Sequence, residues 1–245
     1  MGKPYNAGIA ASNGVEAALL AKAGFVSQPD GLECQQGFAD THAGAFRDQD
    51  KVLEGLGEAF VFEAVQHKFH ACCHGLHAML EAISELQDPP EPESIAEVVI
   101  TTNPQWLRVC NIAEPRTGLE AKFSYRLTAA MALGGVDTGD LKSFTDEVCS
   151  EERLLRLRDR VRVETDDQIP DTAARVSIAL ESGAALSSAH DLSAPLPVQL
   201  REDKIRAKAE KLLGGKASSE LWRIVDSLDT DNLDDFADFL ARQAP

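Results

Sequence analysis

The sequence predicts an α+β fold in which helical segments at both ends of the chain enclose a block where helices and strands alternate. Three observations support this class. A stretch rich in alanine, with two leucines and one glutamate, comes early, at residues 8–24. Three short stretches with strand-like patterns follow in the middle of the chain, and two charged amphipathic stretches come last. This order suits an α/β insertion between two helical pieces of one domain.

The first helix is predicted over residues 8–24, GIAASNGVEAALLAKAG, because strong helix formers dominate it and Gly24 is a typical helix stop. Residues 25–38 follow as a turn-rich link. Residues 46–60 combine charged residues with glycines and show no clear periodicity, so no element is predicted there.

The middle of the chain alternates helix-like and strand-like patterns. A helix is predicted over residues 75–87, and the prolines of DPPEPES stop it. The β-branched stretch at residues 95–103, IAEVVITTN, predicts a strand. A second helix is predicted over residues 118–135, and residues 141–161 predict one or two further short helices.

The last third of the chain begins with two strand-like stretches. Residues 161–167 and 174–183 alternate apolar with polar side chains, which predicts a strand pair that forms a hairpin. Residues 184–198 have the composition of a connector. Residues 201–213 and 231–243 are charged and amphipathic, so both are predicted to be helical.

Composition and charge narrow the class of function. The chain has 245 residues, of which 44% are hydrophobic and 26% charged, enough to bury a sizeable core in one or two domains. Its formal net charge is -16, and its pI is near 4.7. A nucleic-acid-binding protein would normally show a basic face, so that class is disfavoured. An anionic substrate would have to be bound by a few local cations.

The cysteines and the apolar stretches bear on the compartment. The five cysteines are odd in number, and the adjacent pair Cys72 and Cys73 is a poor candidate for a regular disulfide. Reduced thiols in a cytoplasmic protein are therefore expected. The first residues lack the long apolar core of a signal peptide. No run of about 18 apolar residues predicts a membrane span.

Residues 67–78, HKFHACCHGLHA, hold four of the six histidines. On one helix these histidines would fall within an arc of roughly 80°, and His70 and His74 would have the spacing that can chelate zinc. Against this, the stretch contains no carboxylate, the adjacent cysteines do not match the CxxC spacing, and no second ligand pair follows. The alternative is a junction between a strand and a helix, where the histidines point in different directions.

Five stretches, in order along the chain, match the pattern of one family: GKPYNAGIAASNGVEAALLAKAGF, LECQQGF, HKFHACCHGLHAMLEA, GLEAKFSYRLTAAMALGG and RVRVETDDQIP. Together they resemble segments of the MmgE/PrpD family, which includes 2-methylcitrate dehydratase, cis-aconitate decarboxylase and iminodisuccinate epimerase. The resemblance spans nearly the whole chain but covers only the later part of a family chain.

The resemblance implies an all-helical domain, incomplete at its N-terminus in this sequence, that is interrupted by a smaller α/β lid domain. On this basis residues 1–63 form a helical-domain segment, residues 64–193 the lid, and residues 194–245 helices that return to the helical domain. The long N-terminal helical region of the family, which lines one wall of the active site, is expected to be missing from this sequence.

The resemblance also implies a chemistry. Family members act on small di- and tricarboxylates by dehydration, decarboxylation or epimerisation, without a metal or an organic cofactor. Each reaction develops negative charge next to a carboxylate, so cations must hold the carboxylates, and an acid and a base must move a proton.

Three residues are expected to be catalytic. Lys3 falls on the first family lysine and is expected to bind a carboxylate or shift a proton; otherwise it is a solvated terminal residue. Lys68 falls on the second family lysine, at the hinge into the lid; its alternative role is a surface cation. His77 matches a recurrent histidine and is expected to face the cleft; its alternative role is helix packing.

Three residues are expected to bind substrate. Asn6 stands where the family usually has histidine, so it can donate a hydrogen bond but cannot titrate. Cys73 lies in the segment after the second lysine. Ser124 matches the A-K-F-S serine and is expected to donate to substrate from the start of a helix. Leu127 replaces a frequent tyrosine and removes one polar contact.

The remaining polar residues of these segments receive no site role. His67, His70 and His74 stand where the family does not require histidine, so they are interpreted as incidental, and no metal site is expected. Lys122 and Arg126 are expected on a solvated helix face.

Two hypotheses remain open. The chain is either part of a lyase or isomerase, with its missing wall supplied by another polypeptide or absent from this sequence, or a non-catalytic subunit or interaction module of the same fold. A homodimer, or a complex with a chain that supplies the N-terminal helical half, is expected. An uncovered apolar surface on the helix at residues 8–24 would need such a partner.

Overall fold

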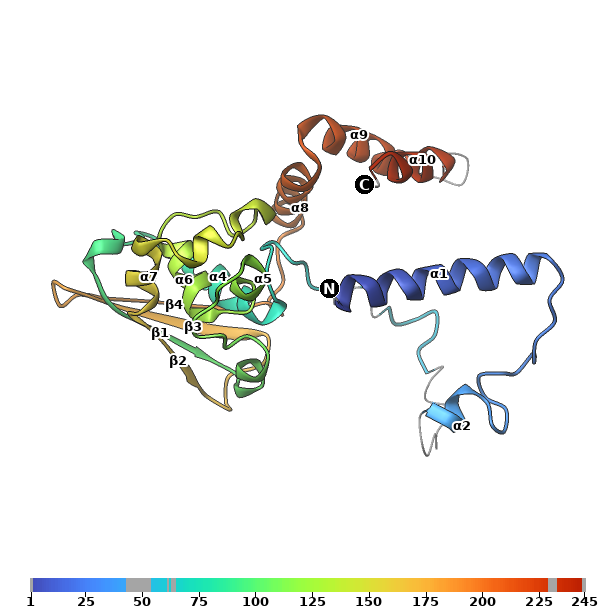
Figure 1. The fold of residues 1–245 in the computed structure, drawn as a ribbon, viewed down its shortest axis with the longest axis horizontal. Coiled ribbons are helices and arrows are strands. Elements are labelled where there is room, and N and C mark those ends of the chain that lie inside the picture. The colour runs from blue at the N-terminus through green and yellow to red at the C-terminus, as the bar shows by residue number, and fades with distance from the viewer. Residues whose placement is uncertain (1, 43–53, 61, 63–64, 229–232, 244–245) are drawn as a thin grey trace. The chain divides into compact units, whose positions relative to one another are not determined.

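The computed structural model divides the chain into two compact units, Met1–Glu63 and Ala64–Pro245 (Figure 1). The structure describes residues 2–42, 54–60, 62, 65–228 and 233–243. The predicted domain boundary after residue 63 falls on positions outside this described part. The assignment of residues 194–245 to a different domain from residues 64–193 stays a prediction.

The first unit contains helix α1 (Gly2–Lys22) and the short helix α2 (Phe38–His42). Helix α1 begins six residues before the predicted start at residue 8. The stretch before residue 8 includes Pro4, which a helix tolerates in its first turn because the N–H groups there have no intrahelical partner. Residues 46–53 of the stretch without periodicity lie outside the described residues.

The second unit combines helices with one mixed sheet, which confirms the α+β class; that the sheet and its helices form a lid domain stays a prediction. Its helices are α4 (His77–Ser84), α5 (Gly118–Ala121), α6 (Tyr125–Leu133), α7 (Glu152–Arg158), α8 (Val198–Leu213), α9 (Gly215–Asp226) and α10 (Leu233–Gln243). Its strands are β1 (Ile95–Thr102), β2 (Val161–Thr165), β3 (Ala173–Leu180) and β4 (Ala185–Asp191).

The sheet has the order β2-β1-β3-β4. Strand β1 pairs in parallel with β2, with Val98 opposite Val161, and antiparallel with β3, with Ile100 opposite Val176. The predicted hairpin between residues 161–167 and 174–183 is therefore wrong, because both strands pair with β1, one on each side. Alternation identifies a strand but says nothing about its neighbour.

The predicted connector at residues 184–198 is also wrong in its first half. Residues Ala185–Asp191 form the edge strand β4, which pairs antiparallel with β3. The stretch ALSSAHD contains no β-branched residue, so local propensity gave no strand signal. Its extended form is set by pairing with the long strand β3, for example where Ser187 lies opposite Ser177.

The predicted helix over residues 118–135 is interrupted. Helix α5 ends at Ala121, and Ser124 has an extended backbone and caps the next helix, its Oγ accepting a hydrogen bond from the Leu127 N–H at 3.2 Å. Serine at this position competes for backbone hydrogen bonds and so favours a cap over a helix interior. Within the predicted helical stretch at residues 141–161, α7 is accompanied by short 3-10 turns.

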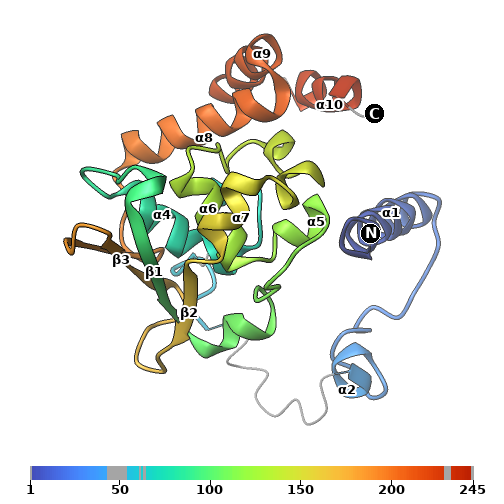
Figure 2. The same cartoon turned by 60° about the vertical axis from the view of Figure 1, so that its left-hand side comes forward.

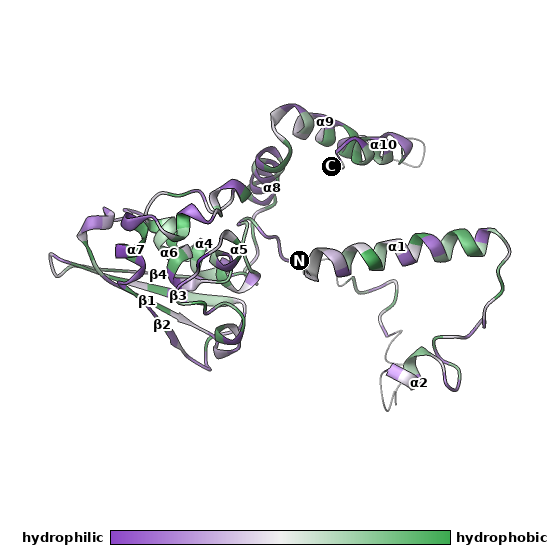
Figure 3. Ribbon diagram, viewed as in Figure 1, coloured by the Kyte–Doolittle hydropathy of each residue, from purple (hydrophilic) through white to green (hydrophobic). Residues whose placement is uncertain are grey.

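The core lies between the helices and one face of the sheet (Figure 2). Helix α4 contacts β3 and β4, while α6 contacts β2. Figure 3 shows apolar colouring along α4 and α6 and mainly polar colouring along α8. Strand β1 contributes alternating buried residues to this core, including Val98, Ile100 and Thr102. The sheet therefore holds α4 in place through contacts with β3 and β4.

The C-terminal helices agree in part with the prediction. Helices α8 and α10 occupy the predicted stretches, whereas α9, which follows α8 after Gly214 at φ 80°, was not predicted. In the described part of the chain, no helix combines the length and apolar character needed to span a membrane.

Candidate functional site

The histidine-rich segment enters α4 from a non-helical stretch. The residues just before His74 are not helical, His74–Leu76 form a 3-10 turn, and α4 begins at His77. A single helix over residues 67–77 therefore does not form, and the zinc arrangement that assumed it is lost. Among the residues that the structure describes, no group of three or more His, Cys, Asp or Glu side chains is placed to hold a metal ion.

The turn nevertheless brings three histidine rings together. The centroid of the His77 ring lies 5.3 Å from that of His70 and 5.4 Å from that of His74. The interpretation of His70 and His74 as incidental concerns their role and stays a prediction, but their rings lie beside that of His77. They form the immediate surroundings of the histidine that the family motif singles out.

Glycine at position 75 allows this turn to pack closely. A side chain at Gly75 would collide with the indole ring of Trp106, which lies against it. The Trp106 indole N–H in turn donates to the carbonyl oxygen of Asp171 at 2.7 Å. The Gly75 carbonyl accepts a hydrogen bond from the Tyr125 hydroxyl at 2.5 Å. These contacts fix the turn on which His74 and His77 lie.

His77 is fully buried, and an interaction with the Cys72 backbone, which favours the charged ring, is too weak to offset the burial. Burial lowers the pKa of His77 to about 3, and the neighbouring His70, His74 and Lys68 add to this effect. A positive charge on a buried imidazole is costly away from water. His77 is therefore a neutral imidazole at neutral pH.

A buried carboxylate lies on the other side of His70. The Nε2 atom of His70 lies 3.4 Å from Oε1 of Glu81, and its Nδ1 atom is hydrogen-bonded to the Thr138 hydroxyl at 2.7 Å. Glu81 Oε2 accepts from the Lys204 ammonium of α8 at 2.5 Å. Burial alone would raise the pKa of Glu81, but the interactions with His70 and Lys204 outweigh it and lower the pKa to about 2. Glu81 is therefore ionised.

Sequence reasoning missed Glu81, Lys204 and Thr138. Glu81 had a local signal, because it follows His77 by four residues on a helix and so lies on the same face. Lys204 and Thr138 had none, because both come from segments distant in the sequence from α4.

Three lysines of α8 lie one or two turns apart, and two of them, Lys204 and Lys208, contact the segment before α4. Besides its bond to Glu81, the Lys204 ammonium lies 4.9 Å from the centre of the Phe69 ring. The Lys208 ammonium donates to the backbone carbonyl oxygen of Lys68. The Lys211 ammonium lies 2.7 Å from a carboxylate oxygen of Asp137. Helix α8 thus fixes the backbone from which Lys68 projects.

Lys68 is exposed at the edge of the cluster. Its positive charge contributes to lowering the pKa of both His74 and His77, second to burial for His74. It also opposes the effect of burial on the Cys72 thiol, whose pKa is nevertheless raised to about 12. The Lys68 charge therefore acts on several groups of the cluster at once, and Lys68 is more exposed to solvent than His70, His74 or His77.

The other predicted site residues lie in different surroundings. Lys3 lies in α1, with its side chain outside the described part, and Asn6 is exposed on the same helix. The backbone N–H of Cys73 donates to the carbonyl oxygen of Lys122 at 2.9 Å. Ser124 begins α6, as expected, but its side chain is fully buried and caps the helix. The roles of these residues toward a substrate stay predictions.

The expectation of a solvated face for Lys122 and Arg126 was wrong. Lys122 is half-buried, with its ammonium 5.6 Å from the centre of the Phe144 ring. Arg126 is half-buried, and its Nε atom is buried without a hydrogen-bond partner in the described residues.

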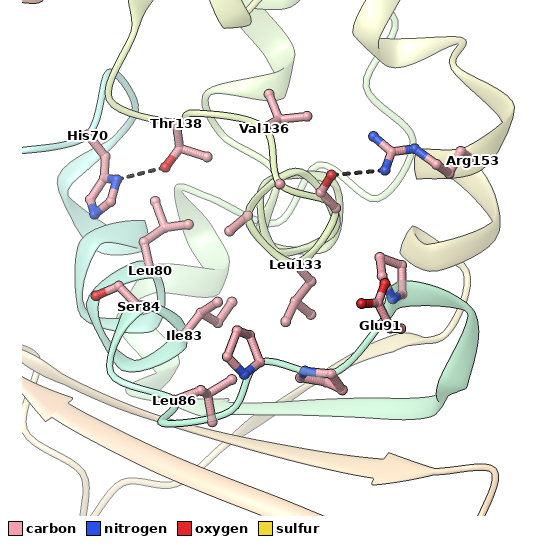
Figure 4. A pocket seen from close by; sticks show the side chains of 16 residues that line it. His70, Leu80, Ile83, Ser84, Leu86, Glu91, Leu133, Val136, Thr138 and Arg153 are labelled. Atoms are coloured by element: carbon pink, nitrogen blue, oxygen red, sulfur yellow. Dashed lines mark hydrogen bonds between the residues drawn. The ribbon is translucent and has the colours of Figure 1, made fainter.

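A cavity of about 570 Å³ opens beside the cluster (Figure 4). His70 and Thr138 lie at one end, and Arg153, which donates to the Gly134 carbonyl oxygen at 2.9 Å, lies at the other. The space between them is lined mainly by apolar side chains, among them Leu80, Ile83, Leu86, Leu133 and Val136. A polycarboxylate needs several cations, so this cavity does not suit such a ligand.

These observations describe an α+β domain with a histidine and lysine cluster at the start of a buried helix. The family model of the MmgE/PrpD C-terminal domain matches residues 70–230, which is more than half of the chain. The chain therefore belongs to the MmgE/PrpD family, as its C-terminal part. This family has dehydratase or lyase roles. A search of curated proteins finds none that matches the chain.

Proposed function

We propose that the chain contributes to a lyase or isomerase that acts on a small di- or tricarboxylate by acid/base chemistry without a metal. The observation that carries this proposal is the exposed Lys68 beside the histidine cluster at the start of α4. A cation and neutral imidazoles side by side are what proton transfer next to a carboxylate requires.

In this proposal Lys68 binds a substrate carboxylate. Its ammonium is exposed and has no carboxylate partner in the part of the chain that the structure describes. Negative charge that develops next to the bound carboxylate is stabilised by this fixed cation. Because the Lys208 ammonium is hydrogen-bonded to the Lys68 carbonyl oxygen, the backbone from which the Lys68 side chain extends is held in place.

His77 is the proposed proton acceptor, and His74 connects it to the substrate. A neutral imidazole can accept a proton. The lowered pKa of His77 also makes it a weak base, so in this proposal it holds the proton only transiently before passing it on. His77 itself is buried, whereas His74 is half-buried and its ring contacts that of His77. A proton taken from the substrate would therefore arrive at His74 first, whose Nε2 is held by Gln66 Oε1 at 2.7 Å.

The reaction would also need groups from the helical part of the family fold. Lys3 and Asn6 are proposed to act there, Lys3 as a catalytic cation and Asn6 as a hydrogen-bond donor to substrate. Cys73 and Ser124 are proposed substrate contacts from the second unit. We propose that the remaining wall comes from a helical part outside residues 1–245, and that the assembly is a homodimer or a complex with a chain that supplies it.

A non-catalytic subunit is the second candidate. Asn6 in place of a titratable histidine favours it, as does Leu127, which is fully buried and offers no polar contact. This candidate shares the fold and the partner with the first but predicts no turnover.

The test is an assay of this chain with and without a polypeptide that supplies the N-terminal helical half of the family. Citrate, 2-methylcitrate, cis-aconitate and iminodisuccinate are offered, and product is followed by proton NMR. Turnover by the combined chains that falls at least tenfold in Lys68→Met supports the proposal. Lys216→Met, which removes an exposed lysine of α9, is the matched control. Combined chains that convert none of the four substrates would leave the non-catalytic candidate.

A further inference from the structure

Helix α8 brings a second lysine to Lys68. The Lys208 ammonium donates one hydrogen bond to the Lys68 carbonyl oxygen, which leaves two of its three N–H groups available. Burial lowers the pKa of Lys208, and the nearby Lys68 charge lowers it further. Because the Lys208 ammonium contacts the Lys68 backbone, the two ammonium groups lie within reach of one lysine side chain of each other. Their positive charges therefore repel.

The neighbouring lysines of α8 differ from Lys208 in one respect. Lys204 and Lys211 each have a carboxylate within 2.7 Å, from Glu81 and Asp137 respectively. In the described residues, neither Lys68 nor Lys208 has an ion pair with a carboxylate. The lack of a carboxylate beside these two lysines stands out in a chain with 40 acidic residues and a net charge of -16.

Two adjacent ammonium groups without an anion favour binding of one. Each charge raises the free energy of the other, and an anion between them removes this repulsion while gaining two charge-assisted hydrogen bonds. An anion bound there would also lie near the histidine cluster, because the Lys68 charge is close enough to lower the pKa of both His74 and His77.

We propose that Lys208 and Lys68 together form a two-cation site that binds a small polycarboxylate. This inference rests on the proposed function, and it adds Lys208 of α8 as a substrate-binding residue. Two cations on separate elements favour a ligand with two or more carboxylates over a monocarboxylate, since each ammonium can then hold its own carboxylate.

The experiment is calorimetric titration of the full 245-residue chain with citrate, and with acetate at matched ionic strength. The variants are Lys68→Met, Lys208→Met, the double variant and Lys208→Arg, with Lys216→Met as the control for the loss of one positive charge. Thermal unfolding of each variant checks that it folds. We expect citrate to bind roughly five- to tenfold more weakly to each single methionine variant, as for loss of one partly exposed ion pair.

The pattern among variants distinguishes a shared site from two separate lysines. We expect Lys208→Arg to bind citrate like the parent and the two single effects to be non-additive in the double variant. Citrate binding that is equal in Lys208→Met and Lys216→Met would overturn the inference and leave the proposed function, which is tested by turnover. A parent chain that binds citrate no better than acetate would also overturn it.

Discussion

Helices α1 and α4 are both rich in alanine and apolar residues, yet they differ in what covers them. All residues of α4 except Ser84 are buried, because the helix lies on β3 and β4 and against α6. The described side chains of α1 are exposed, including Leu19 at 61% and Val15 at 63%. Nothing described in the first unit covers α1. Local composition is thus sufficient to predict a helix, whereas burial of the helix depends on another element that packs against it.

The largest expected effect comes from truncating one leucine in each helix. Leu80 of α4 is 1% exposed and Leu19 of α1 is 61% exposed. Leu80→Ala should lower the free energy of unfolding by about 2–4 kcal/mol, since it removes buried methyl groups and enlarges a cavity. Leu19→Ala should change it by less than about 0.5 kcal/mol. Urea unfolding followed by circular dichroism measures both.

Equal losses of stability in Leu80→Ala and Leu19→Ala would contradict the difference in burial between α4 and α1. A cost for Leu19→Ala near that of Leu80→Ala would mean that another surface buries α1 in solution. Leu20→Ala, at 44% exposed, then serves as a second probe of the same helix.

The next largest effect is a dependence of stability on pH, which comes from His77 at the start of α4. His77 has a pKa of about 3 when folded and an ordinary value near 6.5 when unfolded. Between these values the unfolded chain binds one more proton, so stability falls as the pH drops below 6.5. The loss should reach about 2 kcal/mol between pH 7 and pH 5.

Substitution separates His77 from its neighbour. His77→Leu should flatten the profile between pH 7 and pH 5, whereas His74→Gln should flatten it less, because His74 is less buried. Urea midpoints at intervals of half a pH unit provide the measurement. A parent profile that is already flat over this range would contradict the burial of a neutral His77.

Local patterns in the sequence were sufficient for those parts of the fold that are set locally. The β-branched stretch at residues 95–103 predicted β1 almost to the residue, and the Ala-rich stretches predicted α1, α4 and α6. The order of the strands and the edge strand β4 could not be predicted in this way. The strand order follows from pairing of β1 with β2 and β3 across long sequence separations. Strand β4 pairs with β3, which directly precedes it, but its residues carry no strand propensity.

The same division applies to the candidate site. Lys68 and His77 were found because a motif carries them. Glu81 could have been found from its four-residue spacing to His77. Lys204 and Lys208 could not, because they lie 123 and 140 residues along the chain from their partners Glu81 and Lys68, with the whole sheet between them in sequence.

The smallest effect tests how α8 supports α4. Glu81 is buried, and Lys204→Met removes its ammonium partner while His70 remains. Because Lys204 is partly exposed, the cost at pH 7 should be about 1–2 kcal/mol, below that of breaking a fully buried pair. Lys216→Met should cost close to nothing, and Glu81→Gln with Lys204→Met should recover part of the loss, since no charge then remains buried.

The pH dependence of this cost gives it a second signature. In the parent the folded pKa of Glu81, about 2, lies below its unfolded value of 4.5, so its stabilising contribution is present above pH 4.5 and lost as the pH falls toward 2. Without Lys204 the folded pKa rises, and that contribution shrinks. The difference between parent and Lys204→Met should therefore be largest near neutral pH and narrow below pH 4.5. A difference that is the same at pH 7 and pH 3 would show that Lys204 stabilises α4 by packing on Phe69 and not through its charge.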